Sequence, residues 1–189
     1  AARLLSGPDW YRHAVFYEVY VRSLQDSDGD GIGDLPGLAS RLPELQELGV
    51  DALWLMPIMP SPLADSGYDV SDYRGIHPDL GTMADLDALL AAAHARGMRV
   101  MLDLVLNHTS VDHPWFQESR QDRTNPRADW YVWSDTPSRP DIPCGPVPTF
   151  GTSAWTWDEV RGQYYFHRFR GAQPDLNFWN PDVASAALD

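Results

Sequence analysis

Carboxylates recur at alternate positions between residues 26 and 34, where the chain reads Asp-Ser-Asp-Gly-Asp-Gly-Ile-Gly-Asp. A glycine turn would bring these side chains toward one centre, and oxygen donors of this kind suit Ca²⁺. The run follows an EF-hand loop through its ninth position but has Gly37 at the twelfth, where an EF-hand has a bidentate Glu. We therefore predict a calcium site that is not an EF-hand; the alternative is a turn with solvated charges. The predicted ligands are Asp26, Asp28, Asp30, the Ile32 carbonyl and Asp34.

A polar pair, Asn107 and His108, follows an apolar run over residues 100–106 that contains one acid, Asp103. The run is typical of a buried strand, and binding groups gather at the carboxyl ends of parallel strands. A neutral His108 could bond a ligand hydroxyl, and the Asn107 carbonyl could ligate a cation. The alternative is a polar pair that only caps the sheet.

Two further motifs combine acids with aromatic or amide groups. Gly67-Tyr68-Asp69, with Tyr73 four residues on, offers a carboxylate beside aromatic rings. Such a pair suits a sugar, because Asp accepts from hydroxyls while a ring packs on the C–H face. The alternative is a turn with Tyr68 in the core. The pentapeptide from Gln173 to Asn177 is, by itself, only a turn signal.

Alternating segments must position these groups. Three apolar or β-branched runs, over residues 13–21, 52–56 and 100–106, predict strands. Leucines from Leu38 to Leu48 predict a helix, which Pro43 would either kink or start near Leu42. Thr82 and Asp85 predict a capping box for a second helix that ends at Gly97. The order β-α-β-α-β with short connections predicts a parallel sheet in an α/β fold.

The composition changes from Ser110 onward, where prolines and tryptophans are frequent. Only short strands, such as Gln163 to Phe169, are expected in this part of the chain. The residues from Pro181 to Leu188 predict the first turns of another helix.

Composition excludes several classes of protein. The formal net charge is −13, which argues against nucleic-acid and anionic-membrane surfaces. No run of about 18 apolar residues is present to span a membrane. The single cysteine, Cys144, excludes an internal disulfide, and residues 1–5 lack a signal-peptide core. We therefore expect a cytoplasmic protein.

Taken together and in this order, the motifs resemble the α-amylase family of glycoside hydrolases. They are Trp10 to Glu18, the acidic loop, Gly67 to Asp69, Asp103 to His108 and Gln173 to Asn177. Within the family the chain looks most like the α-glucosidase and oligo-1,6-glucosidase branch, with trehalose synthase close by.

The resemblance implies the N-terminal part of a (β/α)₈ TIM barrel with an irregular loop/β subdomain inserted after the third strand. Residues 1–109 would hold the first three strands and two helices, residues 110–180 the inserted second domain, and residues 181–189 the start of the next barrel helix. It implies that Asp69, Tyr73, His108 and Gln173 bind the glucose unit of an α-linked glucoside such as maltose, isomaltose or a short malto-oligosaccharide. Asn107 and Asp175 match calcium-binding positions in some members.

The family's retaining mechanism uses an Asp nucleophile and a Glu acid/base. In the family these follow the fourth and fifth strands, and a (β/α)₈ barrel takes about 250 residues. We therefore assign no catalytic carboxylate within these residues, and neither Asp69 nor Asp103 takes that role.

Several functions remain open at this point. Ser153 to Glu159 and Gly162 to Tyr165 favour an α-glucosidase, whereas Phe166 to Phe169 favours trehalose synthase, a maltose α-D-glucosyltransferase. A non-catalytic sugar-binding member of the family is the alternative from another class. A calcium-binding structural module would leave Asp69 and His108 unexplained.

Overall fold

The computed structural model describes residues 7–138 and 153–189. Two compact units are present: the residues up to Pro60 together with Arg74–Leu104, and Ser61–Tyr73 together with Val105–Asp189. The loop 61–73 therefore packs with the later part of the chain, although the sequence division at residue 109 grouped it with the first strands. Cys144 and residues 1–6 lie outside the described residues.

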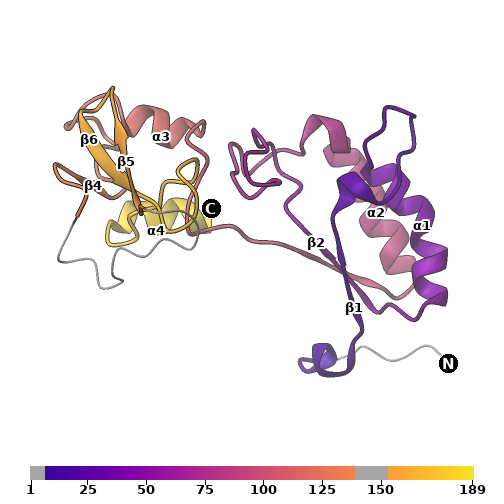
Figure 1. Ribbon diagram of the computed structural model, residues 1–189. Helices are drawn as coiled ribbons and strands as arrows, with labels where there is room; N and C mark the ends of the chain where they lie inside the picture. The colour runs from indigo at the N-terminus through magenta and orange to yellow at the C-terminus, as the bar shows by residue number, and fades with distance from the viewer. Residues whose placement is uncertain (1–6, 139–152) are drawn as a thin grey trace. The chain divides into compact units, whose positions relative to one another are not determined.

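The first unit is built on a parallel sheet of the predicted β-α-β-α-β order (Figure 1). Its strands are β1 (Phe16–Val19), β2 (Ala52–Leu55) and β3 (Arg99–Leu102), and β2 lies between the other two. Short 3₁₀ helices precede and follow β1 at Trp10–His13 and Val21–Ser23, so this strand is shorter than the apolar run that predicted it. A third, Pro78–Leu80, leads toward the second helix.

Helix α1 (Leu35–Glu47) runs through Pro43, as the first of the two alternatives allowed, and begins three residues before Leu38. Asp34 caps it, since its side chain accepts from the Gly37 N–H at 2.6 Å, and a proline already occupies the first turn. Pro43 lies inside the helix, which continues through it to Glu47. The expectation of a start near Leu42 is therefore wrong, because the aspartate cap fixes the start at Leu35.

Helix α2 (Met83–Ala95) has the predicted capping box, in which the Thr82 and Asp85 side chains each accept from the other's backbone N–H. Figure 1 shows α1 and α2 together on one side of the strands. Their buried leucines pack with those of β2 to form the core of this unit: Leu38, Leu42, Leu45, Leu53, Leu55, Leu86 and Leu89.

Strand β3 is more exposed than its apolar sequence predicts. Met101 is 39% exposed, Leu102 46% and Leu104, just after the strand, 72%. The expectation of a strand covered on both faces is wrong for these residues, because β3 is an edge of a three-stranded sheet and the helices cover only one side.

The second unit contains short strands, as expected after Ser110, and also a helix that was not predicted; the strand expected over Gln163 to Phe169 ends at Phe166. Helix α3 (Pro114–Ser119) precedes a small antiparallel sheet of β4 (Trp133–Ser134), β6 (Gln163–Phe166) and β5 (Trp155–Asp158), in that order. Helix α4 (Pro181–Leu188) begins where predicted and is capped by Asn180. An aromatic core joins the elements through Phe116, Trp130, Tyr131, Trp133 and Tyr165. Among the described residues, no helix is both long and apolar enough to cross a membrane.

Candidate functional site

Asp69 lies at the centre of its own loop and is fully buried. One carboxylate oxygen accepts from the Ser61 hydroxyl at 2.9 Å and the Asp65 N–H at 3.0 Å, and the other accepts from the Ala64 N–H at 2.9 Å. Two residues of the loop, Leu63 and Ser66, have positive φ angles of 62° and 55°, a region that costs non-glycine residues energy. Asp69 therefore stabilises a strained loop, with three of its about four acceptor positions in use.

His108 is also buried, with 4% of its surface exposed. Its Nε2 lies 3.0 Å from the Tyr68 carbonyl, which can only accept, so Nε2 carries the hydrogen. Its Nδ1 accepts from the Asn107 amide at 3.2 Å. Burial lowers the pKa of His108, while the Tyr68 carbonyl and the charges of Asp65 and Asp69 oppose that shift. The ring is therefore a neutral imidazole with a defined tautomer, the form in which it could bond a ligand hydroxyl.

Tyr73 fixes the backbone at His108. Its hydroxyl donates to the His108 carbonyl at 2.7 Å, and burial raises its pKa, so the phenol remains protonated. The Phe169 ring packs beside the His108 ring, with 5.2 Å between the two centroids. Sequence reasoning missed Phe169 as a site residue: it placed Phe169 in an expected short strand and in the segment Phe166 to Phe169, whereas β6 ends at Phe166.

Gln173 is fully buried and has both ends of its amide occupied. Its Nε2 donates to the Asp65 carboxylate at 3.0 Å, and its Oε1 accepts from the Arg170 N–H at 3.0 Å. The Asp65 carboxylate also accepts a hydrogen bond from Arg170 Nε at 2.7 Å. Asp65 thus joins the loop 61–73 to the segment 170–173, a role that no local sequence signal indicated.

The structure therefore brings the four predicted sugar-binding residues into one compact unit. All four side chains already form hydrogen bonds to protein groups of that unit. A ligand hydroxyl that reached them would exchange with these internal partners.

Asp175 lies beside Asn107, whose amide N–H donates to it at 3.0 Å. The Arg168 N–H donates to the same carboxylate oxygen at 2.9 Å. Burial raises the pKa of Asp175 to about 6, against the opposing effect of these two hydrogen bonds. Asn107 presents a donor to Asp175, whereas shared calcium coordination would need its oxygen there.

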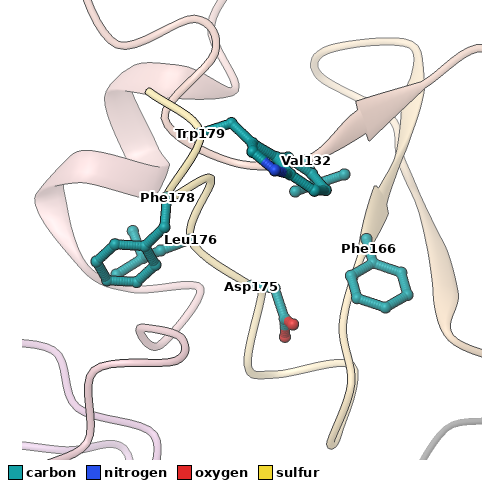
Figure 2. Close-up of a pocket in the computed structure, with 6 residues that line it drawn as sticks. All are labelled: Val132, Phe166, Asp175, Leu176, Phe178 and Trp179. Carbon is teal, nitrogen blue, oxygen red and sulfur yellow. The ribbon is translucent and has the colours of Figure 1, made fainter. Parts of the chain in front are cut away.

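Asp175 also borders a cavity of about 260 Å³ (Figure 2). The other lining residues are apolar and come from the approach to β4, from β6 and from the segment that leads into α4: Val132, Phe166, Leu176, Phe178 and Trp179. Phe178 and Trp179 are 45% and 65% exposed.

The acidic loop of the first unit gathers three of its carboxylates. Oxygens of Asp26, Asp28 and Asp34 lie within 4.8 Å of one another, whereas Asp30 accepts from the Ile32 N–H at 2.7 Å and lies outside this group. The Gly29 N–H contributes most to lowering the pKa of Asp26, and the Gly31 N–H adds to the effect. Three carboxylate oxygen donors at this spacing fit a hard cation such as Ca²⁺.

Gly37 explains why this loop departs from the EF-hand pattern. A Cβ at Gly37 would lie 2.0 Å from the Gln25 carbonyl oxygen, and the Gly37 N–H is the group that Asp34 caps. A glutamate at this twelfth position would therefore not fit.

A parallel α/β unit of this order, with polar residues that follow β2 and β3 along the chain, is the arrangement of the first strands in α/β-barrel enzymes and also occurs in open α/β sheets. Residues 18–189 match the model of the alpha amylase catalytic domain, so the chain belongs to the alpha-amylase family.

Relatives within the family carry several activities in their names. The chain is 56% identical over 182 residues to a probable alpha-glucosidase of Rhizobium meliloti (strain 1021), covering 95% of this chain and 33% of that protein. It is 54% identical over 182 residues to the trehalose synthase of Pimelobacter sp. (strain R48), covering 96% and 32%.

Solved structures agree with this assignment. The alpha-glucosyl transfer enzyme XgtA matches with a TM-score of 0.88 and 54% identity, over 95% of this chain and 34% of that one. A variant of MutB in complex with sucrose matches with a TM-score of 0.87 and 46% identity, over 96% and 33%. The chain thus spans about a third of the length of the relatives it matches.

Proposed function

We propose that the protein containing this chain acts on α-linked glucosides with retention of configuration, as a hydrolase of the α-glucosidase or oligo-1,6-glucosidase type. The observation that carries the proposal is the cluster around His108, where a neutral imidazole, Asp69, Tyr73 and Gln173 share one compact unit. The names of the relatives and the sucrose complex of MutB support a glucoside as the substrate.

The residues of this chain would bind and orient the glucose unit. The His108 Nε2–H would turn from the Tyr68 carbonyl to a sugar oxygen, and Asp69 has acceptor capacity left for a hydroxyl. The Phe169 ring beside His108 offers an apolar face to the C–H groups of the sugar. The nucleophile and the acid/base of a retaining mechanism would come from elsewhere in the protein.

The test is an assay of the full-length protein with maltose and isomaltose, followed by Asp69→Asn. We expect glucose release, and a loss of kcat/KM on the order of 10- to 100-fold in the variant, as for a lost hydrogen bond to a charged group. Asp122→Asn is the matched control, because Asp122 also accepts three hydrogen bonds from its own turn, and it should leave kcat/KM unchanged. A wild-type protein that turns over neither sugar would exclude the hydrolase.

Trehalose synthase is the second candidate, since curated trehalose synthases match at 52% to 54% identity. The same reactions distinguish it: an isomerase converts maltose mainly into trehalose, whereas a hydrolase yields glucose. Detection of neither product, together with retained binding of maltose, would indicate the non-catalytic sugar-binding alternative.

We also propose that the acidic loop binds Ca²⁺ through Asp26, Asp28 and Asp34. A second calcium site at Asn107 and Asp175 would require the Asn107 amide to turn its oxygen toward the ion. Calcium should raise the melting temperature of the chelator-treated protein, with about 2.7 kcal/mol of stabilisation at 100 times the dissociation constant. Asp28→Asn should abolish the shift and Asp122→Asn should keep it. A wild-type melting temperature that does not respond to calcium would contradict the proposal.

A further inference from the structure

Asp65 lies where two segments of the sugar site meet. Its carboxylate accepts from Arg170 Nε at 2.7 Å and from Gln173 Nε2 at 3.0 Å, residues 105 and 108 positions further along the chain. Its backbone N–H donates to Asp69 at 3.0 Å. One residue therefore bonds simultaneously to two candidate sugar-binding side chains, Asp69 and Gln173.

The burial of these groups indicates which of the two bonds to the Asp65 carboxylate is the stronger. Gln173 is fully buried, so the loss of its acceptor would leave an amide N–H without a partner. The Asp65 side chain is 22% exposed and that of Arg170 is 50% exposed, so solvent weakens the ion pair more than the amide bond. The hydrogen bond from Gln173 to Asp65 should therefore contribute more to the stability of this arrangement than the ion pair between Arg170 and Asp65.

Asp65 also acts on the loop that encloses Asp69. The loop holds Leu63 and Ser66 at positive φ, a conformation that persists only when surrounding contacts fix it. Asp65 lies between these contacts, with its amide bonded to Asp69 and its carboxylate bonded to the segment 170–173.

We propose that Asp65 is a positioning residue of the sugar site, which fixes Gln173 and the loop around Asp69 in the geometry that receives the glucose unit. This inference rests on the proposed function. Asp65 does not contact the substrate and acts through its two neighbours.

The test is Asp65→Asn in the full-length protein, with maltose or isomaltose as substrate, whichever the wild type turns over faster. Asparagine keeps the size of the side chain but turns a donor toward either Arg170 or Gln173, both of which need an acceptor. We expect KM to rise on the order of 10-fold with kcat changed less than about 3-fold. Damage to folding alone would instead lower kcat in proportion to the folded fraction and leave KM unchanged.

Asp135→Asn is a closely matched control. The Asp135 carboxylate also accepts from one arginine, Arg123 at 2.8 Å, and one glutamine, Gln163 at 3.0 Å, and neither is a candidate sugar residue. This variant should keep the wild-type KM. A rise in KM as large as that of Asp65→Asn would overturn the proposal.

Arg170→Gln provides a second variant at a half-exposed position, in case Asp65→Asn does not fold. We expect KM to rise roughly 2- to 5-fold, and to rise little further when the change is added to Asp65→Asn, because both act on one network. An unchanged KM in Arg170→Gln, or fully additive effects, would overturn the proposal. An inactive wild type would instead exclude the proposed function, and the role of Asp65 with it.

Discussion

His113 lies between two aromatic rings at the start of α3. Its ring centroid is 5.6 Å from that of Tyr73 and 4.8 Å from that of Trp115, and its Nδ1 accepts from the Trp115 N–H at 3.1 Å. Burial lowers the pKa of His113 to about 4, with Arg127 adding to the shift and Asp72 opposing it. The native state therefore holds this imidazole neutral.

The pH dependence of stability follows from this pKa. Above about pH 6.5 the histidine is neutral in both states, so its contribution to stability is complete. As the pH falls from about 6.5 toward 4, the unfolded chain takes up a proton that the folded chain does not, and stability decreases. The contribution lost by about pH 5 is about 2 kcal/mol.

His113→Asn should remove this loss, because asparagine can still cap α3 but does not titrate. We expect the free energy of unfolding, measured with urea near neutral pH and again at about pH 5, to fall less in the variant than in the wild type. Equal decreases in the two proteins would contradict the assignment.

At the residue scale, local motifs drew attention to Asp69, Tyr73 and His108. The resemblance to the α-amylase family, and not the local pattern, joined Gln173 to them as one predicted sugar-binding set. Asp65 could not be predicted in this way. Its partners lie 105 and 108 residues away, and the contact depends on how two irregular segments pack. Asp30 also lies outside the group formed by Asp26, Asp28 and Asp34, although its spacing in the sequence predicts it as a ligand.

Helix α1 shows how one glycine links the acidic loop to the first unit's core. Gly37 lies in the first turn of the helix, and a Cβ there would approach the Gln25 carbonyl oxygen to 2.0 Å. Because the obstacle is backbone, the clash requires the loop and the helix to separate.

Gly37→Ala should therefore destabilise the protein by roughly 3 kcal/mol, at the upper end of the range for overpacking. Gly49→Asn is the control: its φ is +89°, a left-handed conformation that Asn tolerates, and a Cβ at this position would have no atom within 4 Å. It should cost about 1 kcal/mol or less. Urea unfolding of both variants gives the comparison, and similar losses would contradict the clash.

At the element scale, the order of strands and helices was predictable because apolar periodicity and caps are local. The capping box at Thr82 was confirmed in full. For α1, the alternative with Pro43 inside the helix agrees with the structure, but the start at Leu35 was not predicted because Asp34 was interpreted as a metal ligand and not as a cap. The burial of β3 was not predictable either, since a strand's covering depends on neighbours that its own residues do not specify.

For the whole molecule, the exposed apolar surface of the sheet predicts how the 189-residue chain behaves when it is expressed alone. Phe16, Met101, Leu102 and Leu104 are between 37% and 72% exposed, and open sheet edges promote association. We expect marginal stability and aggregation, which light scattering and calorimetry would detect. A cooperative melt of a monomer would contradict this expectation.

Leu104→Lys offers a direct check of the cause. Leu104 is the most exposed of these residues, so a charge there should reduce scattering without loss of helical signal. Scattering equal to that of the unchanged chain would place the association surface elsewhere.

The separation of Asp65 from Arg170 has a consequence for biosynthesis. A ribosome that adds about 5–20 residues per second makes Asp65 roughly 5–20 s before the arginine that binds it, 105 residues later. During that interval the first unit can already fold, because its strands and helices end before Val105. The nascent loop 61–73 therefore lacks its hydrogen-bond partners until residues 170–173 have been made. A chaperone would bind the partly folded chain most usefully during this period.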